Sequence, residues 1–89
     1  MDVTYNPTRR DINLERYKID FADVEDVFTD LFALTQEDLD HDKGRFVTLG
    51  TDGFGRLLVV TYTLRGQSEI RVISARHARP HERQCYEEG

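Results

Sequence analysis

The second half of this chain is a series of strand-like segments separated by short turns, and this pattern restricts the fold more than any other feature. Residues 45–50, 56–64 and 69–74 are rich in Val, Ile, Leu, Thr and Tyr, which favour strands. The pair Asp52-Gly53 lies in the first connection, and Asp-Gly between apolar runs is a strong hairpin signal. Strands joined by such turns pair antiparallel, so we expect a meander.

The first half carries helix signals instead. Asn6 followed by Pro7 is typical of a helix start, with Asn as the N-cap and Pro at the first helical position. A helix is therefore predicted over residues 7–17, with Ile12 and Tyr17 on its buried side and its arginines facing outward.

A second helix is predicted over residues 21–28, with Asp20 as its cap. Its apolar positions fall at i, i+3, i+6 and i+7, which forms one helical stripe: Phe21, Val24, Val27 and Phe28. Residues 3–5 and 31–35 are predicted as further strands, and residues 36–44 as a polar loop. Pro80 begins a last short helix, which Gly89 ends.

Together these elements predict one α+β domain that spans residues 1–89. The expected order is β-α-α-β-β-β-β-α, in two layers. An antiparallel sheet of about four to five strands would carry the N-terminal helices on one face, with a short C-terminal helix following the last strand.

Charge is divided unevenly along the chain. The net charge is −5, but residues 1–44 hold five Lys or Arg against twelve Asp or Glu. Residues 45–89 hold seven Arg and no Lys against five Asp or Glu. Arginine favours directed contacts with phosphate or carboxylate, whereas the acidic half suits a basic protein partner.

The remaining composition indicates a cytoplasmic protein. Cys85 is the single cysteine, so no internal disulfide forms, as is usual in a reducing compartment. The N-terminal residues lack the basic and apolar regions of a signal peptide. No apolar run approaches the roughly 20 residues that span a bilayer, so we expect no membrane association.

Arginines and hydroxyl groups gather towards the end of the chain. The strand at residues 69–74, the segment just after it and the helix that follows carry six polar candidates: Arg71, Ser74, Arg76, Glu82, Arg83 and Tyr86. Guanidinium groups and hydroxyls match phosphate oxygens and keep their charge or polarity at any physiological pH. The pattern therefore predicts a phosphate site.

Three segments combine features of one known family. Residues 71–86 contain Ile73-Ser74-Ala75-Arg76, then Glu82-Arg83 and Tyr86, after the hairpin of residues 45–64. Near the N-terminus, Asn13-Leu14 and Ile19-Asp20-Phe21 lie at the junction of the two predicted helices, and Val27-Phe28 end the second helix. This combination resembles the BrnT family, the RelE-like ribonuclease toxins of bacterial type II toxin–antitoxin pairs.

The resemblance implies an endoribonuclease whose RNA substrate supplies its own 2′-hydroxyl as the nucleophile, without a metal or another cofactor. It also implies growth arrest and neutralisation by a cognate ribbon-helix-helix antitoxin in a hetero-oligomer. Operator DNA would then be bound only through the antitoxin.

RNA cleavage of this kind needs a proton acceptor, positive charge on the pentavalent phosphate and a proton donor for the leaving oxygen. We predict that five residues are catalytic: Arg45, Arg71, Arg76, Glu82 and Tyr86. Three more are predicted to bind substrate: Ser74, Arg83 and His77.

Each candidate also has a purely structural interpretation. The arginines could pair with Glu69, Glu82 or Asp20, and Glu82 could serve only the helix dipole. Tyr86 could pack on the sheet, and Ser74 could make a hydrogen bond at the strand end. His77 and His81 form a His-x-x-x-His spacing, but the intervening proline argues against a zinc site.

One stretch departs from the family pattern. The family usually carries Lys-His-Gly where this chain has Arg16-Tyr17-Lys18, so both the histidine and the helix-ending glycine are absent. This departure supports an alternative, in which the chain is a catalytically weak scaffold that mainly binds its antitoxin and acts as a co-repressor.

Overall fold

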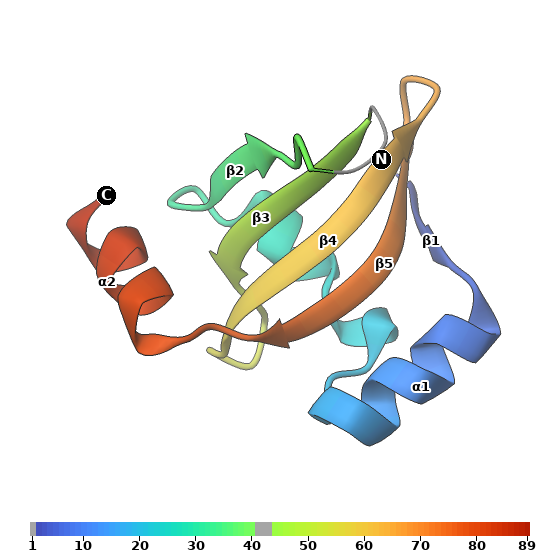
Figure 1. Ribbon diagram of the computed structural model, residues 1–89, viewed down its shortest axis with the longest axis horizontal. Helices are drawn as coiled ribbons and strands as arrows, with labels where there is room; N and C mark the ends of the chain where they lie inside the picture. The colour runs from blue at the N-terminus through green and yellow to red at the C-terminus, as the bar shows by residue number, and fades with distance from the viewer. Residues whose placement is uncertain (1, 41–43) are drawn as a thin grey trace.

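The computed structural model describes residues 2–40 and 44–89, which form a five-stranded sheet with its helices at the edges and on one face (Figure 1). The elements in chain order are β1 (Asp2–Tyr5), α1 (Pro7–Tyr17), the 3-10 helices η1 (Phe21–Asp23) and η2 (Glu25–Thr29), β2 (Leu34–Glu37), β3 (Arg45–Thr51), β4 (Leu57–Arg65), β5 (Glu69–His77) and α2 (Pro80–Glu88). Residues 41–43 of the predicted loop lie outside the described residues.

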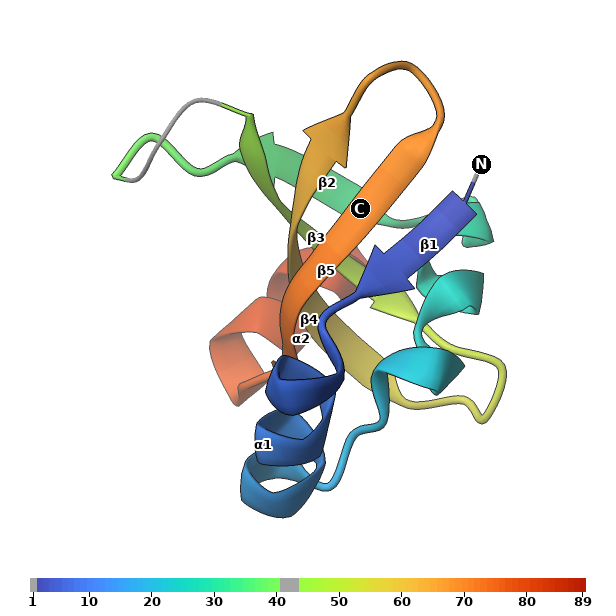
Figure 2. The same ribbon diagram turned by 90° about the vertical axis from the view of Figure 1, so that its right-hand side faces the viewer.

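The sheet is mixed rather than antiparallel. Its order is β1-β5-β4-β3-β2, and β2 to β5 form the predicted antiparallel meander. However, β1 pairs parallel with β5 and lies along it (Figure 2). The sequence pattern of a four-residue strand reveals neither its partner nor its direction, so the parallel edge was not predicted.

One face of the sheet carries the hydrophobic core. The 3-10 helices lie behind this face in Figure 1, and their apolar side chains meet alternate residues of β4 and β5. The buried cluster comprises Ile19, Phe21, Val24, Val27, Leu58, Val60, Tyr62, Ile70, Val72 and Ala75. The opposite face stays open along much of its length, and α2 stands at the end of the sheet where β3 and β5 finish (Figure 1).

The predicted second α-helix is two short 3-10 helices instead. Asp20 does cap the first of them, because its side chain accepts a hydrogen bond from the Ala22 amide. Phe21, Val24 and Val27 are buried at a spacing of three residues, which is the period of a 3-10 helix rather than an α-helix. The prediction of the buried apolar stripe is therefore confirmed, whereas the prediction of an α-helix is wrong.

Helix α1 begins as predicted, with Asn6 accepting from the amides of Thr8 and Arg9. Its buried side differs from the prediction, since Ile12 is 57% exposed and Asn13 is the buried residue. Arg10 does not face freely outward either. It forms a two-pronged ion pair with Asp20, at 2.7 and 2.8 Å.

Strand β2 begins later than predicted. The Asp30 carboxylate accepts from the amides of Phe32 and Thr51, and this holds the preceding residues in a turn. Leu31 and Phe32 consequently point outward, 95% and 74% exposed. None of the described helices is long and apolar enough to cross a membrane.

Candidate functional site

One end of the open face presents a row of polar side chains. Arg45 of β3 lies opposite Thr63 of β4, and Thr63 lies opposite Arg71 of β5. Residues directly opposed in antiparallel strands point to the same side of the sheet, so the two arginines flank one threonine.

A hollow of about 190 Å³ lies over this row. We call it the arginine hollow, and its lining is Arg9, Arg45, Thr63, Arg65, Arg71, Val72 and Ile73. Four separate elements contribute its arginines, and no carboxylate belongs to the lining.

Among the described residues, the four arginines of this hollow form no ion pair with a carboxylate. In the described part of the chain, ion pairs involve Arg10, Arg56 and Arg76 instead. Nε of Arg45 is buried and has no hydrogen-bond partner there. Glu69, opposite Arg65, accepts a hydrogen bond from the Thr4 hydroxyl at 2.7 Å. Clustered guanidinium groups repel one another, so an anion with several oxygens would stabilise them.

A second hollow of about 390 Å³ adjoins the first, and the two share Arg9 and Ile73. We call it the α1 hollow, and its lining is Arg9, Ile12, Asn13, Arg16, Tyr17, Ile73 and Ser74. The five lining residues of α1 follow a spacing of 3, 1, 3 and 1, which places them on one helical face. This face of α1 and the edge of β5 therefore form the walls of the hollow.

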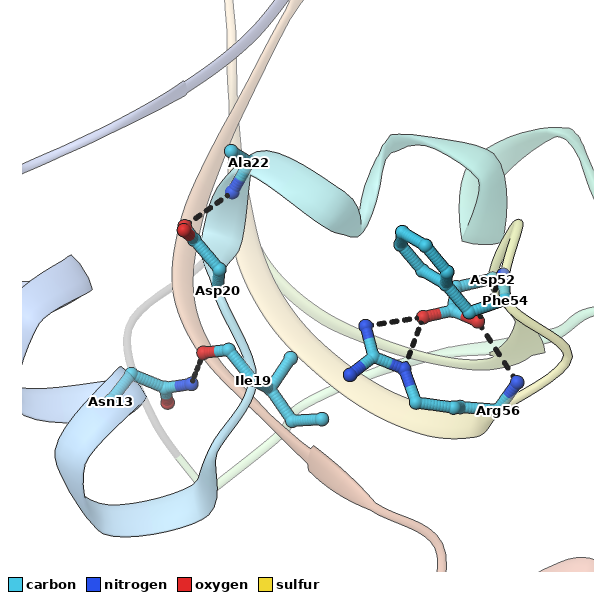
Figure 3. A network of polar contacts seen from close by, with 7 residues as sticks. All are labelled: Asn13, Ile19, Asp20, Ala22, Asp52, Phe54 and Arg56. Carbon is cyan, nitrogen blue, oxygen red and sulfur yellow. Dashed lines mark hydrogen bonds and ion pairs between the residues drawn. The ribbon is translucent and has the colours of Figure 1, made fainter.

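Asn13 fixes α1 against β5. Its amide nitrogen donates to the carbonyls of Ile19 and Ala75, both at 2.9 Å, and its side-chain oxygen accepts from the Ala75 amide at 3.1 Å. Figure 3 shows the contact with Ile19. The buried asparagine thus has both of its N–H donors satisfied and holds the helix at a fixed height over the strand.

A β-bulge in β5 shapes the boundary between the hollows. Thr61 pairs with Ser74, but the next residue of β4, Tyr62, pairs with Val72, so Ile73 is an extra residue. Bulges re-aim side chains and are frequent beside functional sites. Here the extra residue lines both hollows.

Arg76 and Glu82 form an ion pair away from the arginine hollow. The guanidinium donates to the two carboxylate oxygens at 2.8 and 2.9 Å, and the side chains are 25% and 20% exposed. Arg76, with a further bond from the Arg79 amide, lowers the pKa of Glu82 to about 2. Such a carboxylate is a weak base near neutral pH, and the geometry suits an anchor between β5 and α2.

The Tyr86 hydroxyl is also engaged at the α2 end. It donates to Asp30 at 2.6 Å and accepts from the Thr51 hydroxyl at 3.1 Å. The Asp30 carboxylate raises the pKa of this phenol. Thr51 and Arg45 are the two ends of β3, and six residues of strand span roughly 20 Å, so the hydroxyl lies far from the arginine hollow.

The structure therefore divides the residues predicted from sequence into two groups. Arg45 and Arg71 lie together in the arginine hollow, and Ser74 is half-buried in the adjoining one. The other group gathers at the α2 end: Arg76, His77, Glu82, Arg83 and Tyr86, with His77 and Arg83 exposed. The catalytic and binding roles of all of them remain predictions.

Sequence reasoning did not name Arg9 or Arg65 as site residues. Arg65 lies just beyond the strand predicted over residues 56–64, yet it ends β4 and lines the arginine hollow. Arg9 and Tyr17 lie on the same face of α1, and their spacing of eight residues is the signal that could have linked them.

Within residues 2–40 and 44–89, no three His, Cys, Asp or Glu side chains are grouped so that they could hold a metal ion. The His77 and His81 side chains are both exposed.

Comparison with known proteins identifies one family. The family model described as "Ribonuclease toxin, BrnT, of type II toxin-antitoxin system" matches residues 5–82. None of the curated proteins matches.

A solved structure shares the fold. It is the 1.1 Å crystal structure of the Brucella abortus ribonuclease toxin BrnT, which is 24% identical and superposes with a TM-score of 0.75. The match covers 89% of this chain and 97% of that one. Because the family model spans most of the sequence, this chain is a member of the BrnT family of type II toxin–antitoxin toxins.

Proposed function

We propose that this protein is a metal-independent endoribonuclease with a RelE-like arrangement, and that the arginine hollow binds the phosphate at which RNA is cut. The observation that carries this proposal is the absence of carboxylates from a hollow that four arginines line. Membership of a family described as ribonuclease toxins supports the choice of RNA as the substrate.

The chemistry follows from the charge. Attack of the 2′-hydroxyl on the adjacent phosphate forms a P–O bond, places extra negative charge on the phosphate oxygens and expels the 5′-oxygen of the next nucleotide. Arg45 and Arg71, on either side of Thr63, are placed to stabilise that charge by preorganised hydrogen bonds. Nearby positive charge also favours the ionised form of the attacking hydroxyl. Water takes the proton of the 2′-hydroxyl and protonates the expelled 5′-oxygen, so the products are a 2′,3′-cyclic phosphate and a free 5′-hydroxyl.

The α2 group has a different role in this proposal. Arg76 with Glu82 and Tyr86 with Asp30 fix α2 to the end of the sheet, and each of these side chains already has a partner. In this proposal these residues affect cleavage only indirectly, by keeping α2 in place against the sheet.

The alternative, a toxin-like scaffold with weak activity, rests on Tyr17. This phenol lies where the family resemblance predicts histidine, and no histidine lines either hollow among the described residues. A scaffold would bind its antitoxin and repress its own promoter without cutting RNA.

A toxin of this family implies a cognate antitoxin. We propose a small basic ribbon-helix-helix protein that neutralises the toxin in the cytoplasm and makes all contacts with operator DNA. Exposed apolar side chains flank the edge strand β2, with Leu31 and Phe32 before it and Leu39, 83% exposed, after it. Apolar groups beside an unpaired strand edge are typical of partner surfaces, and the acidic first half of the chain suits a basic partner.

The test is cleavage by the purified chain. We expect RNA fragments that end in a 2′,3′-cyclic phosphate or its 3′-phosphate product, formed equally well with EDTA present. Cleavage that EDTA abolishes would contradict the proposed chemistry. The scaffold alternative would be favoured if the chain neither cuts RNA nor slows growth while its complex with the antitoxin still represses the promoter.

A further inference from the structure

We propose that the α1 hollow is a nucleobase subsite, in which a base of single-stranded RNA stacks on Tyr17 while a neighbouring phosphate occupies the arginine hollow. This inference rests on the proposed function and adds to it the part of the substrate that lies beyond the phosphate.

The two hollows adjoin, which is the first reason. Arg9 and Ile73 line both of them, so a ligand that fills one can reach the other along the protein surface. In a nucleotide the base and the phosphate are joined through one sugar. A phosphate held by Arg71 therefore brings a base within reach of the adjoining space.

The lining of the α1 hollow suits a flat aromatic group. Ile12 and Ile73 supply apolar surface, and Tyr17 is half-buried with Arg16 over its ring at 5.2 Å from the centroid. Bases splayed out of single-stranded RNA stack on aromatic rings and on guanidinium planes. Ile12 lines this space and is 57% exposed, and it does not belong to the hydrophobic core.

The polar groups indicate how the base edge would be read. Both N–H donors of Asn13 are used by the carbonyls of Ile19 and Ala75, so they are not available to a ligand. Ser74 lines the hollow, and its hydroxyl forms no hydrogen bond among the described residues. A hydroxyl both donates and accepts, so it can serve any base. We therefore expect stacking to dominate and sequence preference to be modest.

The size of the space is compatible with this occupant. About 390 Å³ is within the usual range for ligand pockets. The arginine hollow is half as large, at about 190 Å³, and more polar in its lining residues. The smaller space thus suits the phosphate and the larger one the base.

The test compares two non-cleavable ligands, a short 2′-deoxy oligonucleotide and the same chain made fully abasic. The wild-type protein should bind the base-bearing ligand more tightly. Tyr17→Leu keeps an apolar side chain against the core but removes the ring, and it should weaken binding of the base-bearing ligand about 5- to 100-fold while leaving the abasic ligand unaffected. Tyr17→Phe, which retains the ring, should bind both as the wild type does.

Further variants separate the subsite from the phosphate site. Ile12→Ser alters an exposed side chain, so it should leave the fold intact and lower only the preference for the base-bearing ligand. Arg71→Ala should weaken both ligands. The subsite is refuted if Tyr17→Leu and Ile12→Ser keep the wild-type preference, or if Tyr17→Phe loses it. If Arg71→Ala binds both ligands unchanged, the phosphate site itself is wrong and the subsite falls with it.

Discussion

At the scale of single residues, two groups of arginines differ in their surroundings. Arg10, Arg56 and Arg76 each meet a carboxylate within the fold. The arginines of the hollow, represented by Arg45 and Arg71, meet none among the described residues. An arginine that is paired with a carboxylate stabilises the folded protein. Clustered arginines without such partners raise the electrostatic energy of the folded protein until an anion binds. Composition alone cannot separate the two groups, because the difference depends on which strands become neighbours.

Lys18 provides a test of local strain. It is the single residue other than glycine with a positive φ in the described part of the chain, at 62°, and it ends α1 in a left-handed conformation. Glycine adopts this conformation without the steric cost of a side chain. We expect Lys18→Gly to raise the free energy of unfolding by about 0.5–1 kcal/mol in urea denaturation. Lys18→Ala, as the control, should give no such gain, and a less stable glycine variant would disprove the strain.

At the scale of elements, two polar contacts hold α2, one to a residue near its own start and one to a distant part of the sequence. Arg76 binds Glu82 across the β5–α2 connection, and Tyr86 reaches Asp30 before β2. Pro80 and Gly89 predicted the bounds of this helix correctly. The sequence offered pairing of an arginine with Glu82 as a structural alternative, whereas the Tyr86–Asp30 contact was not predictable because it depends on a turn at Asp30 that displaces β2.

The Arg76–Glu82 pair predicts a pH dependence. The pKa of Glu82 is lowered to about 2 in the folded state, so the pair stabilises the protein above the ordinary glutamate pKa near 4.5 and is lost as the pH falls towards 2. Glu82→Gln should therefore reduce the free energy of unfolding at pH 7 by roughly 1 kcal/mol, allowing for solvent screening. At pH 2 the variant and the wild type should be nearly equal. A deficit that is the same at both pH values would contradict the assignment.

Element types and bounds were predictable where local chemistry sets them. Asn6 caps α1 as expected, and the hairpin at Asp52 is confirmed, because its carboxylate accepts from the amides of Phe54 and Arg56 (Figure 3). The bulge at Ile73 and the burial of Asn13 depend on tertiary packing. Both shape the candidate hollows, so the sequence identified the fold class better than the site.

At the scale of the whole molecule, the arginine hollow and the exposed side chains of Leu31 and Phe32 lie towards opposite ends of β3. The arginine hollow lies where β3 begins, whereas the edge strand β2, with Leu31 and Phe32 before it, bounds the opposite side of the sheet from β1. A partner can therefore cover one region and reach the other with an extended segment.

This arrangement predicts the behaviour of the antitoxin complex. Purified with the protein encoded beside it, the chain should form a hetero-oligomer with a higher melting temperature than the free chain, because a ligand of the native state stabilises it. Binding should weaken as salt is added, and RNA cleavage should stop. Phe32→Ser, at a side chain 74% exposed, should weaken the complex and leave cleavage by the free chain unchanged. A neighbour that binds without inhibiting cleavage would refute neutralisation by this route.

The central claim is that the arginine hollow, and not the α2 end, performs the chemistry. The most direct measurement is the rate of RNA cleavage by Arg71→Ala and by Arg83→Ala, each compared with the wild type. The melting temperature of each variant must equal that of the wild type, so that a loss of rate does not reflect unfolding. Arg71 lines the hollow, and Arg83 is exposed on α2, so each variant removes one guanidinium from a different place. We predict a loss of at least roughly a hundredfold for Arg71→Ala and a nearly unchanged rate for Arg83→Ala. A folded Arg71→Ala that cuts RNA at the wild-type rate, or equal losses in both variants, would contradict the claim.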